Sequence, residues 1–190
     1  MIDLALGAIV AHLNQALRRS FALREDLVLL ANLHEQDGSV ALQADNRIIV
    51  SLVNIERDTT PQRDLRPASP GLRNVLSPGP VYLNLHVLFA AHFGAANYTE
   101  ALKLISGTIG HFQSRPVLDH QNTPELDPRI DRLALDIANL GIAELSQLWS
   151  ILSGKYLPSV LYRVRMVALD MNSVHGQGRP IVEPRTAALG

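Results

Sequence analysis

The chain contains 190 residues, of which 47% are hydrophobic and 18% charged, the composition of a folded domain rather than of a disordered chain. A formal net charge of -1 gives no electrostatic reason to expect nucleic acid or an anionic membrane as a partner. The sequence contains no cysteine, which excludes disulfides, thiolate metal sites and a cysteine nucleophile within it and fits a reducing compartment. We therefore expect one domain.

The N-terminal segment is predicted to form a helix that packs on a sheet; a partner-facing helix is the alternative. Its apolar side chains recur every three or four positions, at Ile2, Leu6, Ile9, Leu13 and Leu17. Asp3 lies early and Arg18 late, an order that suits the helix dipole but not a secretory signal. No segment approaches the roughly 18 uninterrupted apolar residues of a membrane span, so we expect the chain to be soluble and intracellular at synthesis.

Three strands are predicted before residue 58. The runs 27–33 and 39–42, with turns at residues 37–38 and 45–46, indicate an antiparallel meander. The run 47–55 is apolar on both faces, which is typical of a strand in the middle of a sheet that is covered on both sides. Glu56, Arg57 and Asp58 follow directly, and Pro61 ends the strand. This strand is expected to bring a charged cluster to the rim of the sheet, either as scaffold or as the edge of a site.

Residues 59–80 are rich in proline and glycine and are predicted to form a long irregular loop. Arg63, Arg66 and Arg73 make this loop mildly basic. Irregular loops longer than about 12–15 residues in compact domains are usually functional or disordered. Two interpretations remain open, a solvated connector and a loop that contacts a partner.

A strand and a helix are predicted next. Residues 81–89 alternate between apolar and polar side chains, which indicates a strand with one face in the core. Asn97 is expected to cap the following helix, with Glu100 at the capping-box position. The buried side of that helix is predicted to consist of Leu102, Ile105, Ile109 and Phe112. Gly107 and Gly110 either weaken the helix or allow another element to pack close to it.

The remaining elements are an irregular stretch over 117–128, a strand over 132–137, a helix over 145–152 and a strand over 160–167. Arg163 and Arg165 lie on one face of the last strand, which is expected to be partly wet or to face a partner. Residues 171–190 are predicted to be an extended tail, with Ile181 and Val182 as its only adhesive positions. The sum is an α+β domain with a mixed, largely antiparallel sheet flanked by helices.

Catalytic and metal-binding patterns are weak. The seven histidines fall in no HExxH or other dense ligand spacing, and His86 and His111 are interpreted as partly buried core residues. There is no P-loop, no GxGxxG and no serine in a GxSxG elbow. Asp119, His120 and Glu125 share one loop and form the only candidate acid–base group, although such polar loop residues usually serve as turn and capping ligands. A small hydrolase is therefore the alternative to a binding or assembly module.

Five segments together resemble the cap, or tail-terminator, family of extracellular contractile injection systems of the antifeeding-prophage type. They are MIDLALGAIVAHLNQALRRSF, NIERDTTPQR, VYLNLHVLFAAHF, YTEALKLISGTIGHFQSRPVLDHQNTPELDP and LWSILSGKYLPSVLYRVRMV. The resemblance covers about residues 1–170 in order and fades beyond residue 170, so the expected domain is 1–170 with an arm over 171–190.

The resemblance implies a structural role in a phage-tail-like particle. A cap protein of this kind forms a hexameric ring at the distal end, stops growth of the inner tube and the sheath, and ties the two together. It implies no catalytic activity, no cofactor, and partners that are the protein itself, the tube protein and the sheath protein. The histidine spacing, net charge and hydropathy described above add the expectation of no metal, no nucleic acid and no membrane span. Assembly is expected in the cytoplasm, in a particle that is later released or anchored. A terminator or adaptor placed elsewhere in a related tail is a third possibility.

The expected contact residues combine this implication with the charged and adhesive positions described above. They are Glu56, Arg57, Asp58, Arg63, Arg66, Arg73, Arg163, Arg165, Ile181 and Val182. Charge complementarity at such positions sets the register between subunits. The tail is expected to lend a strand to the sheet of the sheath.

Overall fold

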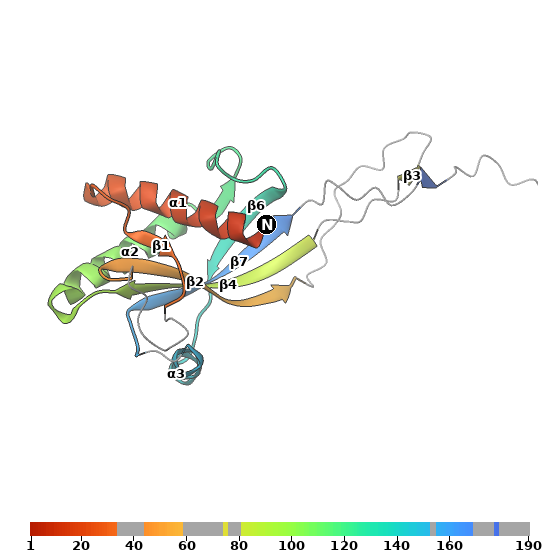
Figure 1. Cartoon of the computed structure of the whole chain (residues 1–190). Coiled ribbons are helices and arrows are strands. Elements are labelled where there is room, and N and C mark those ends of the chain that lie inside the picture. Colours follow the sequence, from red (N-terminus) through yellow and green to blue (C-terminus); the bar gives the residue numbers. More distant parts are fainter. Residues whose placement is uncertain (34–43, 59–73, 76–80, 153–154, 169–176, 179–190) are drawn as a thin grey trace, which may run out of the picture.

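The computed structural model describes residues 1–33, 44–58, 74–75, 81–152, 155–168 and 177–178. A six-stranded sheet with the strand order β1-β2-β4-β7-β6-β5 forms its centre (Figure 1). The strands are β1 (Val28–Leu30), β2 (Arg47–Arg57), β4 (Val81–His92), β5 (Val117–Asp119), β6 (Ile130–Ile137) and β7 (Ser159–Ala168). β1 runs parallel to β2, and all other neighbours in this sheet are antiparallel. The predicted α+β fold with a mixed, largely antiparallel sheet is confirmed.

Helices cover the two faces of the sheet unequally (Figure 1). The helices α1 (Ile2–Phe21) and α2 (Tyr98–Ser114) lie on one face, and the short helix η1 (Ala95–Asn97) precedes α2. The ten-residue helix α3 (Ile142–Ile151) packs on the opposite face. Of the helices in the described part of the chain, none is long and apolar enough to cross a membrane.

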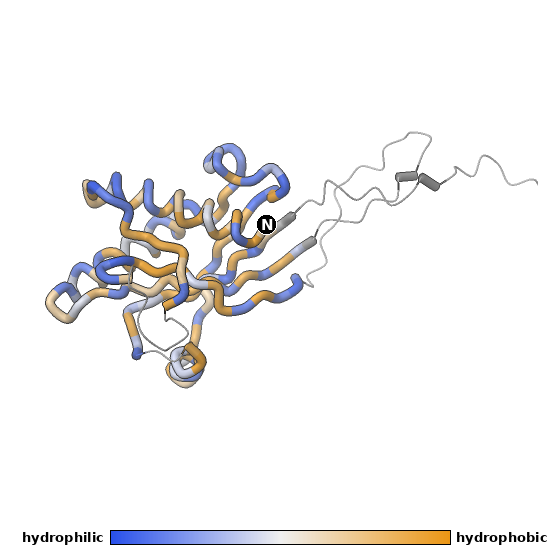
Figure 2. Tube along the Cα trace, viewed as in Figure 1, coloured by the Kyte–Doolittle hydropathy of each residue, from blue (hydrophilic) through white to orange (hydrophobic). Residues whose placement is uncertain are grey.

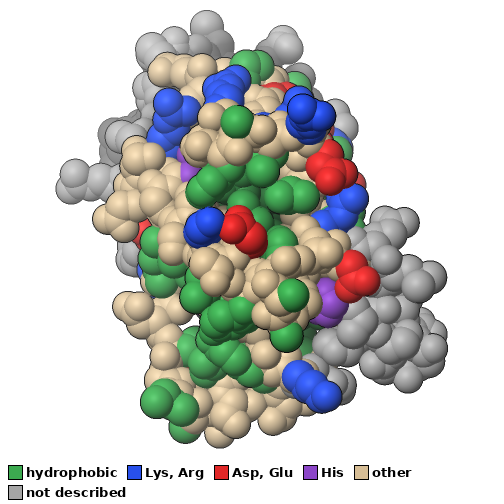
Figure 3. Space-filling model, turned by 90° about the vertical axis from the view of Figure 1, so that its left-hand side faces the viewer, with side chains coloured by type: hydrophobic (Ala, Val, Ile, Leu, Met, Phe, Trp, Pro, Cys, Tyr) green, Lys and Arg blue, Asp and Glu red, His purple; other side chains and the backbone are tan. Residues whose placement is uncertain are grey.

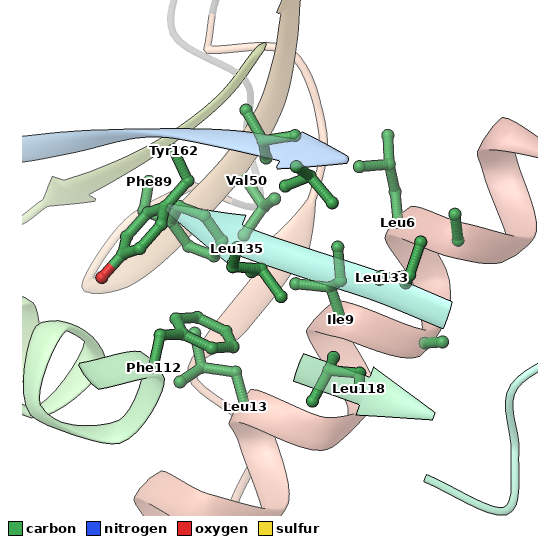
Figure 4. Close-up of a cluster of buried hydrophobic side chains, with 14 of the residues drawn as sticks. Leu6, Ile9, Leu13, Val50, Phe89, Phe112, Leu118, Leu133, Leu135 and Tyr162 are labelled. Atoms are coloured by element: carbon green, nitrogen blue, oxygen red, sulfur yellow. The ribbon is translucent and has the colours of Figure 1, made fainter. Parts of the chain in front are cut away.

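The larger core lies between the sheet and the helices α1 and α2. Figure 4 shows Leu6, Ile9 and Leu13 of α1 pointing toward the strands, as the predicted helical spacing requires. The rings of Phe89, Phe112 and Tyr162 meet there, with centroids 5.4 to 5.6 Å apart in tilted or edge-on arrangements that aromatic pairs favour. Burial raises the pKa of Tyr162 to about 12. Figure 2 shows that the hydrophobic segments follow the strands and the inner sides of the helices.

The packing of α1 against α2 depends on a glycine. A Cβ atom at Gly107 would lie 2.7 Å from Cε2 of Phe21 and 3.2 Å from Cδ2 of Leu17, so only glycine allows this approach without a shift. α1 ends at Ala22, whose φ of 52° is left-handed and whose N–H donates to the carbonyl of Arg18. The prediction that a glycine of this helix permits close packing is confirmed for Gly107.

Two asparagine side chains close the outer edges of the sheet. Asn14 of α1 donates through Nδ2 to the carbonyl of Val28 and accepts the N–H of the same residue, each at 2.9 Å. Asn122 likewise donates to the carbonyl of Val117 at 2.9 Å and accepts the N–H of Asp119 at 3.2 Å. Each amide takes the place of a neighbouring strand, which protects an edge from pairing with another chain.

The predicted antiparallel meander is wrong, because the strand predicted over 27–33 pairs directly with the strand predicted over 47–55. β1 pairs with β2 in parallel, with Val28 opposite Ile48 and Leu30 opposite Val50. Parallel neighbours require a crossover of about a dozen residues or more, and residues 31–46 are long enough to supply one. The strand predicted over 39–42 lies outside the described residues.

Three further expectations are corrected. Asn97 makes no side-chain cap; its Nδ2 donates to Oδ1 of Asn46 at 3.1 Å, while Glu100 pairs with Lys103 at 2.7 Å, so no capping box forms. Leu102 is 43% exposed, because the buried side of α2 consists of Ala101, Leu104, Ile105, Thr108 and Phe112. Residues 117–119, predicted to be irregular, form β5.

Candidate functional site

Strand β2 changes character at a bulge. Ile48, Ile49 and Val50 are fully buried, and they belong to the cores on both faces of the sheet. The register against β4 shifts between Leu52 and Asn54, and the residues from 54 to 57 are exposed. The predicted coverage of this strand on both faces is therefore confirmed for its first half only.

Beyond the bulge, polar side chains of four strands share one face of the sheet. Opposite α1 and α2, the pairing places Asn54, His86, Arg163 and Asp136 in one row across β2, β4, β7 and β6. The next row contains Glu56, Asn84 and Arg165. We call Glu56, Asp58, Asn84, His86, Asp136, Arg163 and Arg165 the charged sheet face.

Two Asp–Arg ion pairs and one His–Glu contact join acidic and basic side chains across these strands. Nε of Arg165 lies 2.8 Å from Oδ2 of Asp58, whose side chain is only 2% exposed. Nε2 of His86 lies 3.3 Å from Oε2 of Glu56. A looser contact of 4.0 Å joins Arg163 and Asp136 at the surface. Exposed pairs of this kind contribute about 0–1 kcal/mol each, so the Asp58–Arg165 pair is the one able to hold strand ends in place.

Helix α3 covers only one end of the same face. Leu148 and Trp149 pack on Ile49, Leu88 and Leu161, which form the smaller core. Two positions along from Leu88 and Leu161, on the same face of the sheet, lie His86 and Arg163 of the charged sheet face. This face of the sheet is therefore apolar under α3 and polar beyond it, where no described residue forms a covering layer.

The long loop and the tail leave from the same end of the sheet. Arg57 at the end of β2 pairs with Leu83 near the start of β4, and Val81 pairs with Ala168 at the end of β7. The strands β3 (Asn74–Val75) and β8 (Gln177–Gly178) pair with each other in an antiparallel two-stranded sheet. The structure thus joins a part of the loop to a part of the tail, two segments that the sequence suggested would act separately.

Five of the ten predicted contact residues lie in the described part of the chain. Glu56, Asp58, Arg163 and Arg165 come together on the charged sheet face, whereas Arg57 alternates to the opposite face. The other five, Arg63, Arg66, Arg73, Ile181 and Val182, lie outside the described residues. Asn84 and Asp136 of this face were not among the predicted contact residues, although both occupy polar positions of strands that alternate between apolar and polar side chains.

Apolar side chains form a second kind of surface on the outer sides of α2 and α3. Tyr98, Leu102, Ile142 and Ile151 are exposed, and Ile142 retains 89% of its accessible surface. Figure 3, which views the end of the molecule at the left of Figure 1, shows groups of hydrophobic side chains separated by charged ones. Hydrophobic side chains separated in this way are common on protein surfaces and do not by themselves mark an interface.

Two of the three residues of the alternative hydrolase, Asp119 and Glu125, make structural hydrogen bonds. Oδ1 of Asp119 accepts the N–H groups of Gln121 and Asn122, which makes it a turn former. Oε1 of Glu125 accepts a hydrogen bond from Nε2 of Gln15 at 2.7 Å. This geometry matches the expected structural role of these carboxylates and does not pair either of them with His120.

In the described part of the chain, no three His, Asp or Glu side chains are placed to hold a metal ion. His86 faces Glu56, and His92 lies 3.4 Å from Asp45. His111 packs against His12 and Phe112 in the layer between the helices, which agrees with its predicted place at the core.

Comparison with solved structures places this fold among tail terminators. The chain is similar over its whole length to the sheath/tube terminator of the PVC extracellular contractile injection system in its extended state, with a TM-score of 0.66, 18% identity and 64% of that chain covered. It is similar over 95% of its length to the tube-terminating cap of the anti-feeding prophage, with a TM-score of 0.55, 18% identity and 60% of that chain covered. At this identity the matches show a shared fold, and the chain spans less than two thirds of the length of both proteins.

Comparison at the level of sequence assigns the family. A search of curated proteins finds no match. The family model described as the Pvc16 N-terminal domain matches residues 8–183, nearly the whole chain. The resemblance seen in the sequence is thereby confirmed, and the chain belongs to the Pvc16 N-terminal domain family.

Proposed function

We propose that this chain is the terminator domain of a contractile injection system, which forms a ring of six copies at the distal end of the particle. The ring ends polymerisation of the inner tube and the sheath and links the two. The observation that carries this proposal is the family membership together with the fold shared with a sheath/tube terminator and a tube-terminating cap. The described surfaces are consistent with a role in assembly, since they combine charged and apolar regions.

The mechanism is steric and electrostatic. A closed ring requires heterologous contacts, in which each copy presents two different complementary surfaces. The side-chain amides of Asn14 and Asn122 bond outward-facing backbone groups of the edge strands β1 and β5. This favours subunit contacts made by the faces and loops of the domain over pairing of another strand at those edges. We assign the charged sheet face to a tube, sheath or neighbouring subunit, because its alternating charges select one register.

The loop 59–80 and the arm 171–190 are proposed to contact whichever of the inner tube and the sheath the charged sheet face does not bind. Both leave from the end of the sheet at which Asp58 and Arg165 pair. The domain is proposed to span residues 1–170, and the family match extends to residue 183, which includes part of the arm. Ile181 and Val182 would supply the strand that pairs with the sheath.

We further propose that the chain acts without catalysis or a cofactor. It would assemble in the cytoplasm into a particle that is later released or anchored, and it would bind itself, the tube protein and the sheath protein but no nucleic acid. No observation favours the hydrolase alternative, since Asp119 accepts hydrogen bonds within its own turn and Glu125 accepts one from Gln15 of α1.

Deleting the gene and imaging the particles tests the proposal. We expect particles with uncontrolled tube length or without a sheath, and restoration by the intact gene. Particles of normal length with a complete sheath would contradict the proposal.

A charge-reversal variant tests the assigned surface. Arg163→Glu should fail to restore normal particles, because Arg163 is half exposed on the charged sheet face. Lys103→Glu is the matched control, since Lys103 is similarly exposed on α2 and pairs only with Glu100 in the described part of the chain. Equal restoration by both variants would remove the charged sheet face from the proposal and leave the capping role itself intact.

A further inference from the structure

A polar cavity lies between α1, the end of α2 and the loop that follows β5. Its volume is about 520 Å³, and it opens to solvent on the side of the molecule away from the charged sheet face. The lining includes His12 and Arg19 of α1, His111 and Arg115 at the end of α2, and Glu125 of the loop. These residues play no part in the function proposed above.

His12 is a buried histidine with an unused nitrogen. It is only 9% exposed, and its Nδ1 lies 3.2 Å from Oγ1 of Thr123. The single proton of that hydroxyl is donated to Oδ1 of Asn122 at 2.8 Å, so Nδ1 of His12 must donate to the hydroxyl oxygen. Nε2 then carries a bare lone pair, and it has no hydrogen-bond partner in the described part of the chain. A buried polar atom of this kind calls for a water, an ion or a ligand.

His111 repeats this situation beside His12. The two ring centroids are 5.0 Å apart, and Nε2 of His111 also has no partner among the described residues. Burial, His12 and Arg115 lower the pKa of His111 to about 4. Burial also lowers the pKa of His12, and Arg115 and Arg19 act in the same direction, against the opposing effect of Glu125. Both effects favour the neutral form of each ring, and in the described part of the chain neither Nε2 atom has a hydrogen-bond partner.

The charged side chains of the cavity lining, two arginines and one glutamate, sum to a net positive charge. Arg19 lines it from α1 and Arg115 from the position directly after α2, and within the described residues neither makes an ion pair. Glu125 is the only carboxylate of the lining, and its Oε1 is occupied by Gln15. The guanidinium group is the side chain best suited to carboxylate and phosphate oxygens, which it binds with two parallel hydrogen bonds.

We propose that this cavity binds an oxyanion of the carboxylate or phosphate type between Arg19 and Arg115, and that binding is coupled to proton uptake by the His12–His111 pair. The anion supplies the acceptor that a protonated Nε2 lacks, and its charge offsets the repulsion from the two arginines. The titratable and charged groups that face His12 are Arg19 from α1, His111 from α2, Arg115 directly after α2, and Glu125 from the loop. Because one bound proton accompanies the anion, affinity should rise as the pH falls, by at most about tenfold per unit.

The test uses the full chain and sodium sulfate, an oxyanion that does not titrate near neutral pH, with sodium chloride at equal ionic strength as reference. Histidine ring nitrogen resonances are followed by NMR between pH 5 and pH 8, roughly the range in which histidines titrate. We expect sulfate to raise the apparent pKa of His12 and to shift His12 and His111, while His92 is unchanged. Equal effects of chloride and sulfate, or an affinity that does not depend on pH, would overturn the proposal.

Arginine variants locate the anion. Arg115→Gln and Arg19→Gln should each weaken sulfate binding about tenfold, the loss expected for one charged hydrogen bond. Arg132→Gln, which removes an exposed charge from β6 outside the cavity, should leave binding unchanged. A loss of equal size in the control would mean a nonspecific charge effect and would refute the assignment.

A short poly-glutamate peptide distinguishes the source of the anion. Tighter binding of the peptide than of sulfate supports a carboxylate supplied by a partner protein. Tighter binding of sulfate supports a free inorganic oxyanion. Failure of both to bind would overturn the proposal without affecting the capping role, which does not depend on this cavity.

Discussion

The two Asp–Arg pairs of the charged sheet face should differ sharply in coupling energy. Asp58 and Arg165 lie 2.8 Å apart, with side chains 2% and 37% exposed, whereas Asp136 and Arg163 lie 4.0 Å apart, with side chains 67% and 49% exposed. Both pairs join the same residue types on the same face, so they form a matched comparison within one chain. We predict that only the first pair contributes measurably to stability.

The magnitudes follow from burial. Removing one partner of a fully buried pair costs about 3–5 kcal/mol, and the partial exposure of Arg165 reduces this for Asp58→Asn to about 2 kcal/mol. The coupling energy of the Asp58–Arg165 pair should be about 1–3 kcal/mol, within the range for residues in contact. The coupling of the Asp136–Arg163 pair should be below about 0.5 kcal/mol and should vanish in high salt.

The measurement is a double-mutant cycle by denaturant unfolding. It uses Asp58→Asn, Arg165→Gln and their combination, with Asp136→Asn and Arg163→Gln as the control cycle. Unchanged m-values would show that the unfolding reaction stays comparable between variants. Equal coupling energies for the two cycles would refute the argument that burial separates these pairs.

Three further predictions concern stability. Ala22→Gly should raise the free energy of unfolding by about 0.5–1 kcal/mol in a denaturant titration, because Ala22 has a left-handed φ of 52°; a loss would contradict this reading. Gly110→Ala should stabilise the protein by about 1 kcal/mol, since a Cβ there meets nothing within 4 Å. Gly107→Ala should not give this gain, because its Cβ would collide with the ring of Phe21. Equal shifts in melting temperature for the two variants would contradict the predicted collision. The pKa of His111 is lowered to about 4, so the folded protein loses stability as the pH falls from about 6.5 toward 4. His111→Asn should remove about 1–2 kcal/mol of that loss, a figure reduced for the partial exposure of the ring. Identical profiles of unfolding free energy against pH for the variant and the parent would contradict this prediction.

The periodic patterns predicted the helices and long strands because these elements bury one clear face. The spacing of Ile9, Leu13 and Leu17 predicted α1, and the alternation along residues 81–89 predicted β4. The direction of β1 relative to β2 could not be predicted, since three apolar residues are equally compatible with parallel and antiparallel pairing. The strand β5 was missed for a similar reason, because it is short and lies between prolines.

The residues of the charged sheet face could be predicted from the sequence in part, but their arrangement in space could not. The sequence indicated that Glu56 and Asp58 lie at a strand end and that Arg165 lies on a wet face. It did not show that β4 lies between β2 and β7, which brings Asp58 within reach of Arg165. The His12–His111 cavity left no local signal either, because its residues are 99 positions apart and meet only through the packing of α1 on α2.

The location of the protein in assembled particles tests the central claim most directly. An electron-dense label attached to the chain should appear by electron microscopy at one end of each particle, the end opposite the baseplate, and as a ring in end-on views. Label distributed along the sheath, confined to the baseplate or absent from intact particles would contradict the account.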